Sequence, residues 1–264
     1  MSPVTGNKKI ALALGAGSAR GLAHIGVIQV LREEQVPIHM VAGSSIGAVT
    51  GAFLAAGMDF YRLGRMVEEM DFRLLLDVQV PRLGFIRGRK IYQLLKLLTQ
   101  GKNFADLELP LAVVATDLES GERVVIDQGE VAEALRASIS IPGVFQPVRW
   151  QNRWLVDGAV SERLPVNVAR GMGADLVIGV DVTYGGREVE ISNTLNVVLQ
   201  AIELLEKQLH DLHLAQADIL IQPKTGCIGN IRFDRASECI RLGREAAREA
   251  LPRIWKALTG EGFS

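Results

Sequence analysis

The amino-acid sequence predicts a three-layer α/β/α fold with a mostly parallel central sheet. Between residues 9 and 56, a buried strand, a glycine-containing turn and a helix follow one another twice, which is typical of βαβ units. Farther along, residues 176–182 form the continuous apolar run of a strand that a parallel sheet buries on both faces. The 264 residues are 48% hydrophobic, which is enough to fill the core of a single domain spanning 1–264.

The first two strand–helix pairs follow from local sequence. The apolar run 9–14 predicts a strand, and a glycine-rich turn leads from it into a helix that continues through Leu31. A second strand ends at Ala42, and a helix-forming run reaches about Ala56. Downstream, the same rules predict strands at 111–116, 123–126, 154–156, 176–182 and 219–221, and helices at 132–138, 196–215 and 234–258.

Residues 59–103 differ in character from the α/β pattern and are expected to form a helical insert or lid. Apolar residues recur there at helical spacing, at Ile91, Leu94, Leu95 and Leu98. The segment 78–105 carries basic residues and no acidic one; the basic residues are Arg82, Arg87, Arg89, Lys90, Lys96 and Lys102. Two interpretations stay open: a surface helix with a solvated face, or a rim that makes peripheral contact with an anionic lipid surface.

Composition and charge exclude several classes of protein. A net charge of −1 argues against nucleic-acid binding, which needs a strongly basic face. Cys227 and Cys239 are expected to be reduced thiols of a cytoplasmic protein, and residues 1–9 lack the pattern of a secretory signal. The uncharged stretch 40–58 is predicted to be a buried strand, turn and helix rather than a membrane span, because it contains glycines and serines.

The stretch Gly43-Ser44-Ser45-Ile46-Gly47 stands between the second strand and its helix. A G-x-S-x-G pattern in that position is typical of a nucleophile elbow, a strained turn that exposes a serine hydroxyl. Gly43 and Gly47 are needed because the chain passes close to itself on both sides of the serine. The alternative interpretation is a glycine-lined turn without chemistry.

The first glycine turn, Gly15 to Gly21, invites comparison with a dinucleotide-binding fingerprint. Arg20 stands at the sixth position of that fingerprint, where glycine or alanine is needed, and the second strand ends in the elbow instead of an acidic residue. The turn is better suited to an oxyanion hole, with backbone N–H groups of Gly17 and Ser18 directed at a developing negative charge. Arg20 could fix the loop or attract an anionic head group.

A serine nucleophile needs a base. A Ser-His-Asp arrangement in the chain order of α/β hydrolases would require His210 or His213, which lie on a predicted amphipathic helix. Asp157 is the better candidate because it follows a short apolar strand and precedes Gly158, so its carboxylate is expected at the carboxyl end of a strand. Taken alone, this Asp-Gly pair is also a common turn sequence.

Together these motifs resemble the patatin-like phospholipase family in its compact bacterial form. The resemblance extends from Ile10 to about Arg241, and the order and spacing of its motifs are more specific than any one of them. The matching stretches are 14–26, 43–47, 115–122, 137–144, 155–159, 173–175 and 180–182.

The resemblance implies a Ser–Asp dyad that hydrolyses acyl esters of phospholipids or lysophospholipids, without metal or cofactor. Ser45 would be the nucleophile and Asp157 the general base. The family's oxyanion motif falls on residues 16–21, where Ala16 and Ser18 replace glycines. Supporting positions are Gly15, Arg20, Gly21, Gly43, Gly47 and Gly158. Two alternatives remain, a small-ester carboxylesterase and a lipid-binding regulatory protein with little catalysis.

A carboxylate base has consequences for the dependence of activity on pH. The ordinary pKa of an aspartate, about 4, is low for general-base work, so the site must raise it. We expect activity to persist to lower pH than a histidine-based triad allows. A rate that falls below about pH 6.5, where histidine becomes protonated, would count against the dyad.

Overall fold

The computed structural model describes residues 8–78, 83–185, 197–198, 200–206, 214 and 216–259. Of the helix expected over 196–215, residues 197–198, 200–206 and 214 are described, and all of them are helical. Arg82, His210 and His213 lie outside the described residues, so the predictions that rest on them are not addressed by the structure.

The described strands form one sheet of eight, ordered β5-β6-β3-β2-β1-β7-β8, with β4 also paired to β3. Strands β1, β2, β3, β7 and β8 pair in parallel, while β4, β5 and β6 pair antiparallel, so the prediction of a mostly parallel sheet is confirmed. The strands are β1 (Ile10–Leu14), β2 (Met40–Ser44), β3 (Leu111–Asp117), β4 (Arg123–Ile126), β5 (Val148–Trp150), β6 (Arg153–Asp157), β7 (Leu176–Val180) and β8 (Ile219–Ile221).

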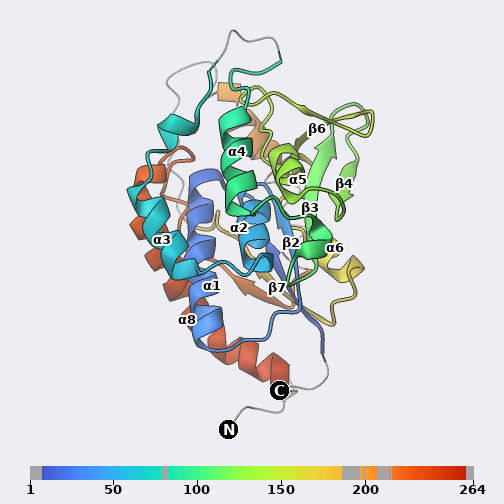
Figure 1. Ribbon diagram of the computed structural model, residues 1–264. Helices are drawn as coiled ribbons and strands as arrows, with labels where there is room; N and C mark the ends of the chain where they lie inside the picture. Colours follow the sequence, from blue (N-terminus) through green and yellow to red (C-terminus); the bar gives the residue numbers. More distant parts are fainter. Residues whose placement is uncertain are drawn as a thin grey trace.

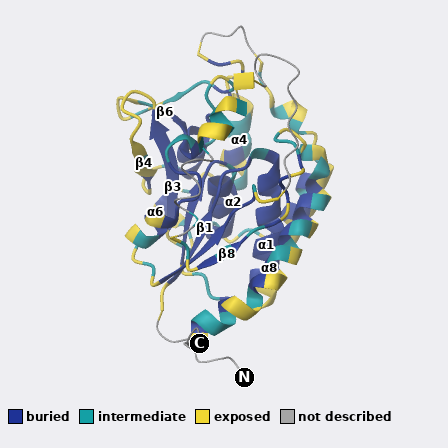
Figure 2. Cartoon of the chain, turned by 180° about the vertical axis from the view of Figure 1, so that it is seen from behind, coloured by how far each residue is buried: buried dark blue, intermediate teal, exposed yellow. Residues whose placement is uncertain are grey.

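Helices cover both faces of the sheet, as the three-layer prediction requires (Figure 1). Ile10, Leu12 and Leu14 of β1 join the core beneath α1, α2, α5 and α8, whereas Ala11 and Ala13 face the smaller core beneath α6. The helices are α1 (Ala23–Glu33), α2 (Ile46–Ala55), α3 (Phe60–Glu69), α4 (Arg89–Leu98), α5 (Val131–Ser138), α6 (Val166–Gly171) and α8 (Ala236–Thr259). Figure 2 shows the buried strands enclosed by helices whose outer sides are exposed.

Short 3₁₀ helices occupy several turns around this core. They are η1 (Ser18–Leu22), η2 (Phe72–Leu75), η3 (Phe104–Asp106), η4 (Gly158–Val160) and η5 (Phe233–Arg235). η1 fills the turn between β1 and α1, and η4 directly follows β6. η1 therefore carries the second half of the glycine turn, and η4 carries the residues that follow Asp157.

The strand registers bring three chain segments to one place. Leu14 of β1 lies beside Gly43 of β2 and beside Val180 of β7, so these three strands end together. Ser44 pairs with Val114 of β3. The next β3 residue, Ala115, pairs with Asp157 of β6, so Asp157 lies next to the turn that follows β2.

The region 59–103 contains α3, η2 and the predicted helix α4. Asp59 caps α3 by accepting hydrogen bonds from the N–H groups of Tyr61 and Arg62, at 2.8 and 3.1 Å. α3 packs against α1 and α8, and Leu95 of α4 is buried in the main core. None of the helices in the described part of the chain is both long and apolar enough to span a membrane.

Candidate active site

Ser45 occupies a strained turn between β2 and α2. Its φ of 54° and ψ of −127° lie outside the regions that non-glycine residues usually adopt. A Cβ at Gly43 would lie 2.4 Å from the Cα of Ala48, and a Cβ at Gly47 would lie 2.2 Å from the carbonyl oxygen of Leu14. Both flanking positions therefore exclude any residue larger than glycine, as the elbow pattern predicts.

The structure brings Ser45 and Asp157 together. The Ser45 hydroxyl donates a hydrogen bond of 2.6 Å to Oδ2 of Asp157. The other carboxylate oxygen, Oδ1, accepts from the N–H of Ala159 at 2.9 Å, which fixes the orientation of the carboxylate. Ser45 is 6% exposed and Asp157 is 3% exposed, so the pair is nearly removed from water. A Cβ at Gly158 would lie 2.3 Å from the carbonyl oxygen of Val114, which accounts for the glycine after Asp157.

Burial raises the pKa of the Asp157 carboxyl from 3.8 to about 6. Hydrogen bonds from Ser45 and Ala159, together with the positive charge of Arg163, oppose the rise. The carboxylate is thus a stronger base than an exposed aspartate, while it is still ionised near neutral pH.

Asp157 is the last residue of β6, which confirms its expected place at the carboxyl end of a strand. The direction of that strand was not predicted. In the structure, β6 runs antiparallel to β3 and overlaps only residues 115–117 of that strand. Because Asp157 pairs with Ala115 at the end of this short overlap, the end of β6 lies beside Ser45, although β6 runs in the opposite direction to β3.

The glycine turn lies against the elbow. A Cβ at Gly21 would lie 2.1 Å from Cγ2 of Ile46, and a Cβ at Gly17 would lie 2.5 Å from Cγ2 of Val182. Ser18 has a φ of 49°, a value in the left-handed region that favours glycine. Within the described residues, the N–H groups of Gly17 and Ser18 have no hydrogen-bond acceptor, so both remain available as donors.

In the described part of the chain, His24 and His39 hydrogen-bond to backbone groups, and neither hydrogen-bonds to Ser45. The His24 Nε2 lies 2.8 Å from the carbonyl oxygen of Gly15, to which it donates in the neutral ring, and burial lowers the pKa of His24 to about 4. His39 accepts a hydrogen bond from the N–H of Ile10 at 3.0 Å, at the start of β1 and away from the elbow.

Two further residues, Ser138 and Arg163, act on the site, and neither was predicted to have a role there. The hydroxyl of Ser138 accepts a hydrogen bond from the N–H of Ser45 at 2.9 Å and donates one of 2.6 Å to the carbonyl oxygen of Val114. Arg163, six residues after Asp157, is buried and acts on that carboxylate through its charge. Ser138 belongs to the stretch 137–144, which resembles the patatin-like family. That resemblance marks the stretch but does not indicate a function for Ser138 itself.

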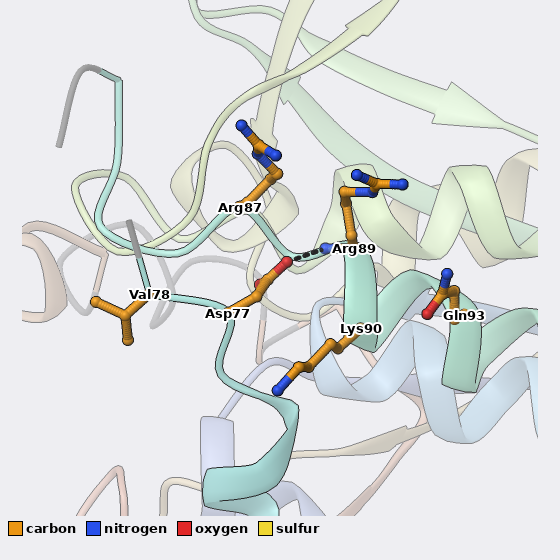
Figure 3. Close-up of a pocket in the computed structure, with 6 residues that line it drawn as sticks. All are labelled: Asp77, Val78, Arg87, Arg89, Lys90 and Gln93. Carbon is orange, nitrogen blue, oxygen red and sulfur yellow. Dashed lines mark hydrogen bonds between the residues drawn. The ribbon is translucent and has the colours of Figure 1, made fainter. Parts of the chain in front are cut away.

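A separate hollow of about 400 Å³ opens near the start of α4. It is lined by Asp77, Val78, Arg87, Arg89, Lys90 and Gln93. Asp77 accepts hydrogen bonds from the N–H groups of Gly88 and Arg89, at 2.6 and 2.8 Å, and so caps the helix. Figure 3 shows the bond to Arg89. The described residues contain no cluster of three His, Cys, Asp or Glu side chains that could hold a metal.

The fold and the site define a class, a three-layer α/β protein that holds a serine in a strand-to-helix turn against a buried aspartate. Within this class, residues 12–170 match the family model described as patatin-like phospholipase. The chain belongs to the patatin-like phospholipase family.

Known relatives extend beyond the length of this chain. An uncharacterized NTE family protein of Mycobacterium tuberculosis is 41% identical over 174 residues, which cover 65% of this chain and 48% of the relative. Human patatin-like phospholipase domain-containing protein 6 is 33% identical over 215 residues, which cover 78% of this chain and 15% of the relative. The chain spans about half the length of the mycobacterial relative. VipD from Legionella pneumophila has a similar fold, with a TM-score of 0.67 at 16% identity over 93% of this chain and 67% of its own.

Proposed function

We propose that the protein hydrolyses fatty-acyl esters of phospholipids or lysophospholipids through a Ser45–Asp157 dyad. The observation that carries this proposal is the hydrogen bond of 2.6 Å between the Ser45 hydroxyl and a carboxylate that is almost fully buried. Membership of the patatin-like phospholipase family supports a lipid ester as the substrate.

In the proposed reaction, Asp157 takes the proton of the Ser45 hydroxyl as Oγ bonds to the ester carbonyl carbon. The carbonyl oxygen becomes an oxyanion, stabilised by the N–H groups of Gly17 and Ser18. The bond to the alcohol oxygen then breaks, and the protonated Asp157 returns the proton to the leaving alcohol. Water next loses a proton to Asp157 and attacks the carbonyl carbon of the acyl-enzyme. The bond to Ser45 Oγ then breaks, Asp157 returns the proton to Oγ, and the fatty acid leaves.

The test is covalent labelling with a long-chain alkyl fluorophosphonate, detected by intact mass. Ser45 attacks phosphorus and fluoride leaves, so the wild type should gain one adduct. Ser45→Ala should gain none, and Asp157→Asn should react at least about a thousandfold more slowly. Circular dichroism establishes that each variant is folded. A folded wild type that takes no label would refute the dyad.

Two alternatives are separated by substrate length. A lipid hydrolase should prefer long acyl chains in a series of esters that differ only in chain length. A small-ester carboxylesterase should prefer the shortest esters, and a lipid-binding regulatory protein should bind lipid while it hydrolyses the whole series poorly. The buried, strained Ser45 supports the hydrolase over a binding protein, because strain of this kind usually persists at functional sites.

A surface of the 59–103 insert supports peripheral contact with a membrane, and we propose that it forms the rim of the site. Residues 83–88 alternate in burial, so Leu83, Phe85 and Arg87 are exposed while Gly84, Ile86 and Gly88 face inward. Among the basic residues of 78–105, Lys96 pairs with Glu130, and Lys102 donates to a backbone carbonyl. In the described part of the chain, Arg87 and Arg89 have no ion-pair partner, so their charges are available to anionic head groups.

The same segment is linked to the candidate active site. The N–H of Ile86 donates to the carbonyl oxygen of Val144 at 2.8 Å, and the buried guanidinium of Arg136 donates to the carbonyl oxygen of Arg87 at 2.8 Å. Arg136 lies on α5, the helix that ends at Ser138 beside Ser45. A lipid surface that met residues 83–87 would therefore lie close to the elbow.

Vesicle sedimentation tests this surface. The wild type should bind vesicles that contain phosphatidylglycerol more tightly than vesicles of phosphatidylcholine alone. The double variant Arg87→Gln/Arg89→Gln should lose about thirtyfold in affinity, because each surface charge contributes about 1 kcal/mol. Arg170→Gln/Arg149→Gln is the charge-matched control, because Arg170 on α6 and Arg149 on β5 lie outside the 59–103 insert. Equal losses in both double variants would refute the assignment of this surface.

A further inference from the structure

Arg20 connects the glycine turn to a helical segment whose described residues are 197–198 and 200–206, named here the segment 197–206. Its side chain is 2% exposed, and its Nη1 donates to Oε1 of Glu203 at 2.8 Å. Its Nε donates to the carbonyl oxygen of Ile228 at 2.7 Å. Glu203 also accepts from the side chain of Asn230 at 3.1 Å, and the backbone carbonyl of Asn230 accepts from the N–H of Ala19 at 3.1 Å. Glu203 is thus attached to the turn both through Arg20 and through Asn230.

A second ion pair joins the same helical segment to the loop after Asp157. Nη1 of Arg163 donates to Oε2 of Glu206 at 3.0 Å, with side chains that are 7% and 14% exposed. The backbone carbonyl of Arg163 accepts from the N–H of Ala16 at 2.9 Å. One helical segment therefore contacts both loops of the proposed reaction, the oxyanion turn and the loop of the base.

The segment 197–206 has an unusual distribution of polarity. An amphipathic helix normally turns its apolar face to the core. Here the two glutamates are shielded, while Leu204 and Leu205 are 50% and 65% exposed, and none of the described residues of the segment is fully buried. Ion pairs and hydrogen bonds, more than apolar burial, hold these residues against the two loops.

Shielded ion pairs of this kind depend strongly on both partners. Removal of one partner leaves a buried charge without compensation, and its former neighbours shift to find water or another partner. Arg20 is the side chain of the turn itself, so loss of Glu203 would act directly on the donors at Gly17 and Ser18. A displacement of about 1 Å at a catalytic group can lower a rate about a hundredfold.

We infer that Glu203 and Glu206 are positioning residues. Through Arg20 and Arg163, they hold the oxyanion turn and the base loop in fixed positions relative to each other. The inference rests on the proposed hydrolase function. The segment 197–206 is thus a clasp, that is, an element that contacts both loops through the Arg20–Glu203 and Arg163–Glu206 ion pairs and fixes them to each other. The clasp acts on the geometry of the reacting groups and leaves the binding of a small substrate unchanged.

The first experiment measures hydrolysis of a short, soluble p-nitrophenyl ester by Glu203→Gln and Glu206→Gln. We expect kcat to fall about tenfold or more in each variant, while KM changes less than about twofold. The matched control is Glu33→Gln, which removes a partly shielded pair with Arg244 between α1 and α8. A variant that changes KM alone, or leaves kcat equal to that of the control, would overturn the assignment.

Hydrogen–deuterium exchange gives a readout that does not require activity. In Glu203→Gln, the amides of residues 16–22 should exchange faster, and in Glu206→Gln those of 158–164 should do so, with β7 unchanged. Unchanged exchange in these segments would overturn the clasp, whatever the rates show. If the wild type resists the fluorophosphonate, the hydrolase proposal fails, whereas exchange still decides whether the glutamates order the loops.

One further variant covers the case in which Glu203→Gln does not fold. Asn230→Ala removes the hydrogen bond from the Asn230 side chain to Glu203 and leaves the ion pair with Arg20 intact. We expect kcat to fall below that of the wild type, together with faster exchange at Ala19. No change in either measurement would contradict the attachment described above.

Discussion

Asp157→Asn should make the folded protein more stable at alkaline pH while it removes activity. Burial holds the pKa of Asp157 at about 6, above its ordinary value of 3.8. A group whose pKa is raised by folding favours the folded state when it is protonated, and this contribution is lost as pH rises through the folded pKa. Asparagine is neutral at every pH, so the free energy of unfolding of the variant does not fall as pH rises through about 6.

The magnitude follows from the difference between the two pKa values, 3.8 and about 6. At 1.36 kcal/mol for each pKa unit, ionisation of Asp157 lowers the free energy of unfolding by about 3 kcal/mol at pH 8. The same linkage gives about half that loss at pH 5 and only about 0.5 kcal/mol at pH 4. The amide of asparagine can still accept from the N–H of Ala159 and donate to Ser45 Oγ, so the hydrogen bonds need not oppose the gain.

Urea denaturation of the wild type and Asp157→Asn at pH 8, 5 and 4 measures this difference. The variant should unfold at higher urea at pH 8, and its advantage should shrink as pH falls. Equal stability at pH 8, or an advantage that does not depend on pH, would refute the argument. Ser45→Ala is the control, because it removes the neighbouring hydroxyl and leaves the carboxylate in place.

Three further predictions follow from the same structure. The rate of ester hydrolysis should be high above the pKa of Asp157 and fall as pH drops through about 6, which a pH–rate profile with a soluble ester measures. Gly47→Ala should destabilise the fold by about 3 kcal/mol or more, because its Cβ would lie 2.2 Å from a backbone oxygen, whereas Gly171→Ala, with nothing within 4 Å, should change stability by less than about 1 kcal/mol in urea denaturation. A thiol reagent should modify the exposed Cys227 in the native protein and spare Cys239, since burial raises the pKa of the Cys239 thiol to about 12, and two fast-reacting thiols would contradict this.

The raised pKa of Asp157 changes one expectation from the sequence. A carboxylate base near its ordinary pKa would keep the enzyme active well below pH 6.5. With a pKa of about 6, the acid limb of the profile lies close to that of histidine, so a pH–rate profile by itself separates the two bases poorly. The sequence gives no measure of burial, and it is burial that moves this value.

Local sequence sufficed for the parallel core and the elbow. Apolar runs predicted β1, β3, β7 and β8, because strands buried on both faces need continuous apolar residues. The structure adds α3, α6 and β5. α6 has only six residues, too few to show a helical period, and the three residues of β5 include Arg149, which interrupts the apolar run.

The contacts around Ser45 could not be read from local sequence because they join distant segments. Ser45 and Ser138 are 93 residues apart, and Ser45 and Asp157 are 112 apart. Resemblance to a family indicated the pair of Ser45 and Asp157, but it did not indicate the contact between Ser45 and Ser138. The direction of β6 was also hidden, since an apolar run of three residues is the same in a parallel and an antiparallel strand.

Arg163 offers a way to identify the base without removing it. Its charge lowers the pKa of Asp157 against the larger effect of burial, so Arg163→Gln should raise that pKa and move the acid limb of the pH–rate profile to higher pH. Arg170→Gln makes the same change in net charge, but Arg170 donates to the carbonyl oxygen of Asp175 just before β7, at the end of the sheet away from the elbow. It should leave the limb in place. If Arg163→Gln moves the limb no farther than Arg170→Gln, the titrating group is not the carboxylate beside Arg163, and Asp157 is not the base that limits the rate at low pH.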